Sequence, residues 1–176
     1  MKELMKPVVV LTSICLVVTA LLAFVNQLTL PVIVEAEEKA AAAARTEVLP
    51  EAKDFQRLTP DALPEGVTDV YEGSNHTGYV ILVQTKGYGG LIKLICGIRE
   101  DGTLSAVKTL SHSETSGVGT KAVDNHNGYR ERFVGTTAES YQQVDTITGA
   151  TISSTAYQKA IGLAFDAYRM IKEAGA

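Results

Sequence analysis

One uncharged segment constrains this 176-residue chain more than any other feature. Residues 7–34 contain no Asp, Glu, Lys or Arg. A helix needs about 20 apolar residues to cross the hydrocarbon core of a bilayer, and this segment is long enough. In a soluble protein, a helix this apolar would need other elements to cover it on every side. We therefore expect residues 1–34 to form a short N-terminal stub and a transmembrane anchor.

The charges on either side of this segment predict its orientation. Lys2 and Lys6 precede it, and the acidic stretch 35–38 follows it. Positive residues favour the cytoplasmic side, so we expect a single-pass protein of the cell (inner) membrane with a cytoplasmic N-terminus. The alternative is a cleaved signal peptide, but the uncharged run is longer than a usual signal core. Residues 21–23, Leu-Leu-Ala, also lack the small residue expected three positions before a cleavage site.

Charge and cysteine content exclude several classes of protein. Sixteen Lys and Arg against twenty Asp and Glu give a net charge of −4, without any basic block, so nucleic-acid binding is not expected. Two cysteines, Cys15 and Cys96, are too few for a disulfide framework or a four-ligand zinc site. We expect no metal site.

The remainder of the chain is predicted to divide into two parts. Residues 35–47 are charged and rich in alanine, which favours helix. Pro60 and Pro64 then indicate a connecting segment. We expect residues 35–67 to form a helical stalk with this connection, and residues 68–176 to form the extracytoplasmic domain.

The expected domain is α+β, with a mostly antiparallel sheet. An Asp-Gly pair at 101–102 is a strong hairpin signal between two predicted strands. Apolar residues recur at steps of three and four over 153–174, which predicts a C-terminal amphipathic helix. Helices covering one face of an antiparallel sheet form the α+β class. The predicted strands are 70–72, 78–84, 91–98 and 104–110.

Three glycine-rich clusters are candidate sites. The clusters at 86–90 and 114–121 are individually weak signals, since the first is also typical of a hairpin connection. The third, at 145–155, places hydroxyl side chains and small residues directly before the predicted helix. Free N–H groups at a helix start favour phosphate. A helix cap at Ser153 or Ser154 would explain part of this pattern equally well.

Taken together, the clusters resemble a known family. Asp145 and the run Thr-Gly-Ala-Thr at 148–151 are similar to the signature at which a flavin transferase attaches FMN to threonine. Gly-Tyr-Gly-Gly at 87–90 and Glu-Thr-x-Gly-x-Gly at 114–119 lie where the FMN-binding domain family carries its other motifs. The resemblance covers residues 70–172. It departs from the common pattern at Ser116 and Val118, where the family more often has Pro and Leu.

The resemblance implies a covalent FMN, joined through a phosphoester bond to Thr151, which would be the acceptor and not a catalytic residue. It also implies that Asp145 is part of the recognition sequence for the transferase. The serines after Thr151 would donate hydrogen bonds to the phosphate, and the flavin ring would lie on the two glycine loops with Glu114 near its polar edge. The further cofactor-binding residues are Thr148, Gly149, Ala150, Ser153, Ser154, Glu114, Thr115, Gly117, Gly119, Tyr88, Gly89 and Gly90.

A chain of this length with one N-terminal membrane helix and such a domain most resembles the G subunits of Rnf complexes. These are membrane ferredoxin:NAD⁺ oxidoreductases coupled to Na⁺ or H⁺ translocation. The resemblance implies an electron-relay subunit without substrate turnover of its own. Its partners would be polytopic membrane subunits, iron–sulfur and flavin subunits, a flavin transferase and membrane lipid. The alternatives are the C subunit of a sodium-pumping NADH:quinone reductase and a stand-alone membrane-anchored FMN carrier for an extracytoplasmic reductase.

Overall fold

A computed structural model describes residues 2–60, 62–125 and 128–174. The chain divides into two compact units, with the boundary between Ala40 and Ala41. The first unit is the N-terminal part of helix α1, which runs over Lys2–Val48. Among the described residues this is the one helix long and apolar enough to cross a membrane.

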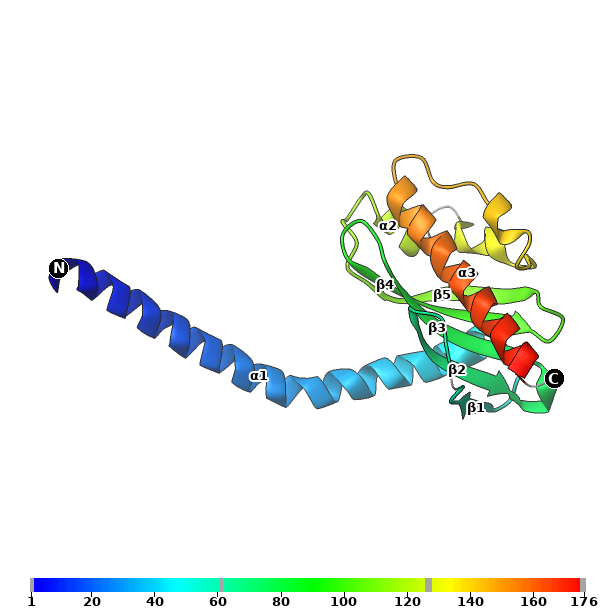
Figure 1. Cartoon of the computed structure of the whole chain (residues 1–176), viewed down its shortest axis with the longest axis horizontal. Helices are drawn as coiled ribbons and strands as arrows, with labels where there is room; N and C mark the ends of the chain where they lie inside the picture. The colour runs from blue at the N-terminus through cyan, green and yellow to red at the C-terminus, as the bar shows by residue number, and fades with distance from the viewer. Residues whose placement is uncertain (1, 61, 126–127, 175–176) are drawn as a thin grey trace. The chain divides into compact units, whose positions relative to one another are not determined.

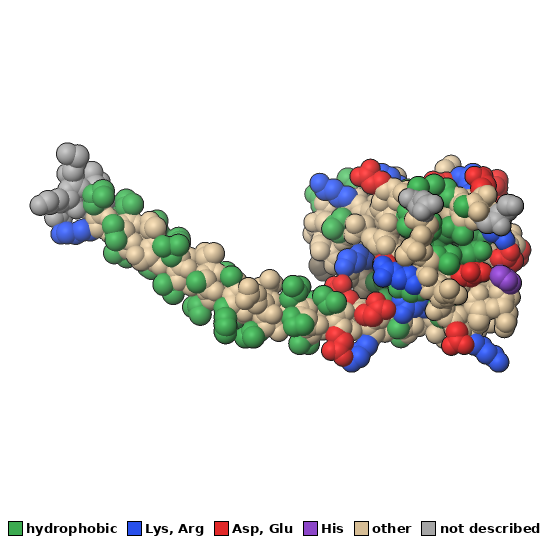
Figure 2. Space-filling view, turned by 60° about the horizontal axis from the view of Figure 1, so that its bottom comes forward, with side chains coloured by type: hydrophobic (Ala, Val, Ile, Leu, Met, Phe, Trp, Pro, Cys, Tyr) green, Lys and Arg blue, Asp and Glu red, His purple; other side chains and the backbone are tan. Residues whose placement is uncertain are grey.

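The surface of this helix suits lipid. Its apolar side chains are exposed, Leu16 by 67% and Leu22 by 65%, and Figure 2 shows them along the helix. The hydroxyl groups of Ser13 and Thr29 donate to the carbonyl oxygens of Val9 and Val25, at 2.8 and 3.0 Å. These two hydroxyl groups thus have partners within the helix, as a bilayer requires. The chain is therefore membrane-anchored, as the sequence predicts.

The second unit is built on a five-stranded antiparallel sheet (Figure 1). Its strands follow one another in the order of the chain: β1 (Phe55–Leu58), β2 (Val67–Gly73), β3 (Gly78–Lys86), β4 (Leu91–Arg99) and β5 (Leu104–His112). Gly102, with φ of +83°, lies in the predicted hairpin between β4 and β5. The expected α+β class is confirmed.

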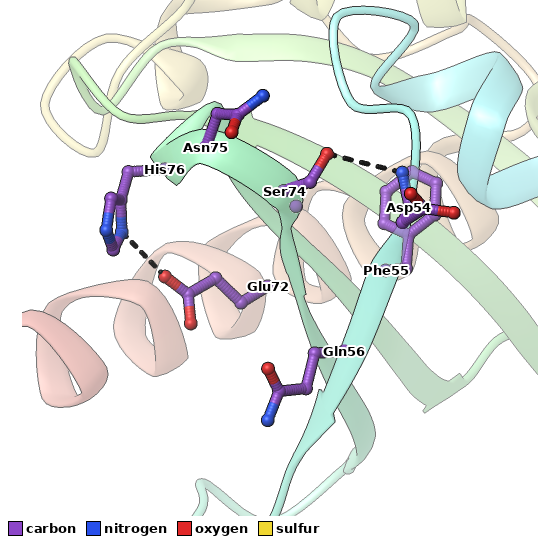
Figure 3. Close-up of a pocket in the computed structure, with 8 residues that line it drawn as sticks. Asp54, Phe55, Gln56, Glu72, Ser74, Asn75 and His76 are labelled. Atoms are coloured by element: carbon purple, nitrogen blue, oxygen red, sulfur yellow. Dashed lines mark hydrogen bonds and ion pairs between the residues drawn. The ribbon is translucent and has the colours of Figure 1, made fainter.

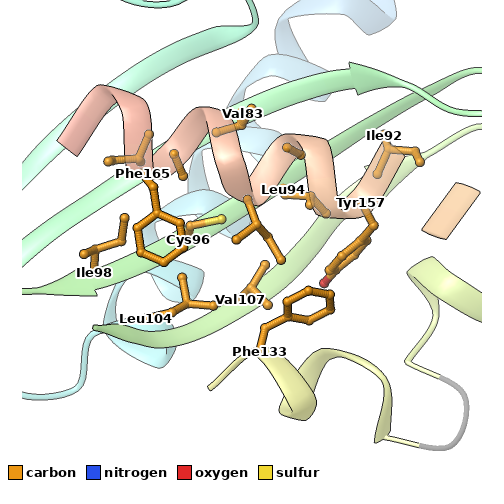
Figure 4. Packing of buried hydrophobic residues seen from close by; sticks show 14 of the residues in the cluster. Val83, Ile92, Leu94, Cys96, Ile98, Leu104, Val107, Phe133, Tyr157 and Phe165 are labelled. Atoms are coloured by element: carbon orange, nitrogen blue, oxygen red, sulfur yellow. The ribbon is translucent and has the colours of Figure 1, made fainter. Parts of the chain in front are cut away.

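Helix α3 (Thr151–Ala174) lies across one face of the sheet, as Figure 1 shows. The short helix α2 (Thr120–Val123) and the 3₁₀ helices η3 (Arg130–Phe133) and η4 (Tyr141–Gln143) belong to the same layer. Between them and the sheet lies the main core, part of which Figure 4 shows. Cys96 is fully buried there, and burial raises its pKa to about 12.

An aromatic cluster supports the first turns of α3. The ring of Tyr157 lies 5.8 Å from those of Phe133 and Tyr129, which are themselves 5.2 Å apart. All three are fully buried, and burial raises the pKa of Tyr129 to about 12. Aromatic rings at such separations contribute about 0.5–1.5 kcal/mol per pair beyond the area that they bury. The packing of these three rings therefore holds the first turns of α3 in place.

Two features of the second unit were not predicted. Residues 41–48, expected as stalk, bury Ala44 and Val48 against the other face of the sheet. Gly97 makes this approach possible, since a Cβ there would overlap the carbonyl group of Val48. Strand β1 lies in the expected connecting segment and pairs with β2. The domain in the structure thus begins well before residue 68.

Candidate functional site

The three glycine-rich clusters meet at one end of the sheet. The first loop, 87–90, joins β3 to β4, and the second, 113–119, follows β5. Ile92 pairs with Thr85 of β3 on one side and with His112 of β5 on the other. This register places both loops at the same end of the sheet, beside the start of α3. The sequence prediction that these distant motifs belong to one site agrees with this arrangement.

The carboxylate of Glu114 lies where the three segments meet. Its Oε2 accepts hydrogen bonds from the backbone N–H of Gly89, at 3.2 Å, and from the hydroxyl of Ser153, at 2.9 Å. Glu114 is only 9% exposed. Its other oxygen, Oε1, is buried without a hydrogen-bond partner among the described residues. Glu114 thus joins both glycine loops to the first turn of α3.

The glycines of the two loops are needed because the loops touch each other. A Cβ on Gly87 would overlap Oε1 of Glu114, and one on Gly119 would overlap Oε2. A Cβ on Gly89 would lie 2.6 Å from the carbonyl oxygen of Ser113, and one on Gly90 would lie 2.7 Å from the Ser113 Cβ. Close packing between the loops therefore accounts for Gly87, Gly89 and Gly90, and Gly119 makes space for the Glu114 carboxylate of its own loop.

The third cluster forms a tight turn before α3. The N–H of Ala150 donates to the carbonyl oxygen of Ile147 at 2.9 Å, and Gly149 has φ of +79°. A positive φ at the third position of a turn favours glycine. The hydroxyl of Ser154 accepts from the N–H of Ile147, at 3.1 Å, and donates to the carbonyl oxygen of Ala150, at 2.8 Å. One buried serine thus fixes the turn against the helix.

Thr151 is the first residue of α3, and its side chain is exposed. By helix geometry, the N–H groups of Thr151, Ile152 and Ser153 have no acceptor within the helix. The side chain of Lys121, from α2, brings its Nζ to 3.9 Å from the position that a Cβ would take on Gly149. The site therefore offers a free hydroxyl, backbone donors and a cation to an anionic group.

A shallow pocket with a volume of about 250 Å³ lies beside Thr151. Three apolar side chains at its rim are exposed: Tyr88 by 61%, Ile152 by 59% and Val118 by 43%. The sequence analysis named Tyr88 and placed Val118 within the second glycine loop, but it did not name Ile152. An exposed isoleucine at the start of a helix is the signal that could have found Ile152. The pocket is lined by Tyr88, Val118, Gly149, Ala150, Thr151, Ile152 and Ser153.

Most of the other predicted residues are not among those that line this pocket. Asp145 and Thr148 are exposed in the segment before α3, and Thr115 is exposed in the second loop. The N–H of Gly117 donates to the hydroxyl of Thr120 at 3.0 Å, and Gly117 has φ of +77°. The hydroxyls of Ser153 and Ser154, expected to face a phosphate, donate within the protein instead.

A second pocket, of about 320 Å³, lies at the other end of β3 (Figure 3). The hydroxyl of Ser74 accepts there from the N–H groups of Lys53 and Asp54, at 3.2 and 3.3 Å. Nδ1 of His76 lies 2.9 Å from Oε1 of Glu72, within hydrogen-bond distance. None of the residues that the sequence singled out lines this pocket, so it is separate from the candidate site.

Comparisons with known proteins agree with this geometry. Residues 87–166, which include all of the three clusters except Lys86, match the FMN-binding domain family. The chain is 29% identical to the G subunit of the Na⁺-translocating ferredoxin:NAD⁺ oxidoreductase complex of Acetobacterium woodii, over 98% of this chain and 95% of that one. It is 30% identical to the G subunit of the ion-translocating oxidoreductase complex of Shewanella piezotolerans, over 93% and 88% of the two chains. Its identity to the protein of the same name in Methanosarcina acetivorans is 32%, over 94% of each chain.

The anchor, the sheet and the glycine-loop site thus define a membrane-anchored flavoprotein with an FMN-binding domain. The similarity extends from this domain through the membrane helix to nearly the whole length of the relatives. The chain belongs to the family of G subunits of ion-translocating oxidoreductase complexes.

Proposed function

We propose that this chain carries FMN covalently on Thr151 and relays electrons within a membrane ferredoxin:NAD⁺ oxidoreductase complex that translocates Na⁺ or H⁺. The observation that carries the proposal is the position of Thr151. Its hydroxyl is exposed at the first turn of α3, between a glycine turn and a pocket with an apolar rim. The names of the relatives support the complex and its chemistry.

The attachment reaction needs little from this chain beyond an accessible hydroxyl. With FAD as donor, a new bond forms between the Thr151 oxygen and the phosphorus of the FMN half. The bond from that phosphorus to the AMP half breaks, and the hydroxyl proton is lost as AMP leaves. A separate flavin transferase performs this step. Asp145 and Thr148, both exposed before α3, are available for that enzyme to recognise.

After attachment, the phosphate would lie at the start of α3. The free N–H groups of the first helical turn favour an anion there, and Lys121 adds a positive charge nearby. The two serines serve indirectly in this arrangement. Ser153 is bonded to Glu114, and Ser154 ties the turn to the helix, so both hold the donors in place.

The ring system would lie against the apolar rim of Tyr88, Val118 and Ile152. Sites for small ligands usually enclose about 300–1,000 Å³, so a pocket of about 250 Å³ covers only part of a flavin. FMN supplies one-electron transfer when it is bound. An incompletely covered ring suits electron exchange with another subunit. We therefore assign the electron donor and acceptor to partner chains of the complex.

The FMN-binding domain would lie on the extracytoplasmic side. In intact cells, a membrane-impermeant maleimide should label a Glu139→Cys variant and leave a Glu3→Cys variant unlabelled. The background is low because Cys96 is buried and Cys15 lies in the membrane helix. Labelling of the Glu3→Cys variant alone would place the domain in the cytoplasm and contradict the proposed side.

The function is tested with two variants of the acceptor in membranes that contain the whole complex. Thr151→Val removes the hydroxyl but keeps the branched shape, and Thr151→Ser keeps a hydroxyl. We expect Thr151→Val to lose the denaturation-resistant flavin of this chain and ferredoxin-dependent NAD⁺ reduction, while the complex still assembles. Thr151→Ser should retain part of both. Full NAD⁺ reduction by Thr151→Val membranes would contradict the relay role.

A further inference from the structure

The structure indicates a role for Glu114 other than contact with the flavin ring. We propose that Glu114 is the positioning residue of the modification site: through Ser153, its buried carboxylate sets the rotation of the first turn of α3 and so points the Thr151 hydroxyl outward. This inference rests on the proposed attachment of FMN to Thr151. It concerns how the chain presents that threonine to the transferase.

Helix geometry links the two ends of this interaction. Successive residues of an α-helix are about 100° apart around the axis, so Ser153 and Thr151 point to nearly opposite sides. Ser153 is only 1% exposed, and its hydroxyl donates to Glu114 at 2.9 Å, whereas the Thr151 side chain is exposed. A bond that holds Ser153 inward therefore holds Thr151 outward.

Glu114 is itself held at both its carboxylate and its backbone. The N–H of Gly89 donates to Oε2, which ties it to the first glycine loop. The N–H of Glu114 donates to Nδ1 of His112 at 3.2 Å, and the other ring nitrogen of His112 lies 2.8 Å from Asp124. This chain of contacts runs from β5 and α2 to the helix start, so the carboxylate is a rigid anchor.

The Glu114 carboxylate and the glycines around it lower the stability of the fold, which a purely structural contact would not require. Oε1 of Glu114 is buried without a hydrogen-bond partner among the described residues, and an unsatisfied buried acceptor destabilises a fold. Gly87 and Gly119 are also required to leave space for the two oxygens, although glycine lowers stability by its freedom in the unfolded chain. Features that cost stability are concentrated at functional sites.

The test compares variants as substrates of a flavin transferase, with the full-length chain in detergent and FAD as donor. Glu114→Ala removes the anchor but leaves Asp145 and the turn for recognition. We expect kcat for attachment to fall about 10-fold or more, while KM for the chain changes by no more than about twofold. Glu114→Gln should restore most of kcat, because its amide oxygen can accept from both Gly89 and Ser153.

A matched control separates positioning from general stability. Val107→Ala in β5 creates a cavity in the main core without touching the site, and should lower the melting temperature while kcat stays near that of the wild type. If kcat falls in Val107→Ala as much as in Glu114→Ala, or if Glu114→Gln is as slow as Glu114→Ala, the inference is wrong. A wild-type chain that accepts no FMN overturns the proposed function, and the inference with it.

The contact also has a readout that does not involve flavin. Gly119→Ala should lower the melting temperature, because its Cβ would overlap Oε2 of Glu114. In a Glu114→Ala background this overlap is gone, and the Ser153 hydroxyl near the same Cβ can rotate away. We expect the loss caused by Gly119→Ala to shrink by half or more in that background. Equal losses in both backgrounds would show that Glu114 does not occupy this position.

Discussion

The glycine turn before Thr151 offers a prediction whose size follows from the structure. Gly149 has φ of +79°, and the nearest atom to a Cβ built on it, Nζ of Lys121, is 3.9 Å away. A Gly149→Ala substitution therefore meets no steric barrier apart from its own backbone conformation. A left-handed conformation costs a residue with a Cβ about 1–2 kcal/mol. This cost lowers the equilibrium constant for forming the native turn by a factor of about 5–30.

If the turn presents Thr151 for modification, attachment of FMN should slow by up to the same factor. The assay measures the initial rate of covalent flavin incorporation by a transferase at a subsaturating concentration of the chain. We expect Gly149→Ala to be slower than the wild type, by at most about 5–30-fold. Gly149→Asn should lie between them, because asparagine tolerates the left-handed conformation despite its larger side chain.

Gly135→Ala is the matched control. Gly135 has φ of +80°, with nothing within 4 Å of a built Cβ, so it has the same backbone cost outside the site. It should lose stability but keep the wild-type rate. The reasoning is refuted if Gly135→Ala slows attachment as much as Gly149→Ala does, or if Gly149→Asn is slower than Gly149→Ala.

Three further predictions concern stability and reactivity. Burial, which raises the pKa of Cys96 to about 12, should keep this thiol unreactive to maleimide until the domain unfolds; rapid labelling of Cys96 in the native protein would contradict the structure. Burial also raises the pKa of Tyr129 from 10.0 to about 12. The stabilisation that the neutral Tyr129 side chain provides is therefore complete below pH 10 and is lost as the pH rises toward 12. The free energy of unfolding falls by about 1.4 kcal/mol per pH unit in this range. In denaturant unfolding, the free energy of unfolding of Tyr129→Phe should fall less steeply with rising pH than that of the wild type, by the equivalent of one proton. An unchanged slope of this free energy against pH would argue against a raised pKa for Tyr129. Gly97→Ala should destabilise the domain because its Cβ would overlap the carbonyl group of Val48, and a melting temperature equal to that of the wild type would show that residues 41–48 do not pack there.

Strong local patterns explain which elements the sequence could predict. The long apolar strands β3 and β4 and the periodic helix α3 have clear signatures, and their observed bounds extend the predicted ones by only a few residues. Strand β1 was missed because it has only four residues, none of them fully buried, and they lie among turn residues. The packing of residues 41–48 was missed because a run of alanines predicts helix without indicating which side is buried.

The site was predictable from its motifs but not in its internal contacts. The sequence analysis assigned Glu114 and Thr151 to one site because each belongs to a recognisable cluster, and in the structure both lie at the start of α3. It could not predict that Glu114 bonds Ser153, a residue 39 positions away, since that contact depends on how the loops fold over the helix start. Gly119 was therefore assigned to the flavin site, whereas in the structure it makes space for the Glu114 carboxylate. Gly87, which the sequence analysis did not assign to the cofactor, makes space for the same carboxylate.

The central claim, that Thr151 carries FMN, is tested most directly by mass spectrometry. The full chain would be produced with a flavin transferase, denatured and measured intact, and its peptides would then be mapped. The account predicts a gain of one FMN less one water, located on the peptide that contains Thr151, and no gain in Thr151→Ala. An unmodified wild-type chain, or a modified Thr151→Ala chain, would contradict it.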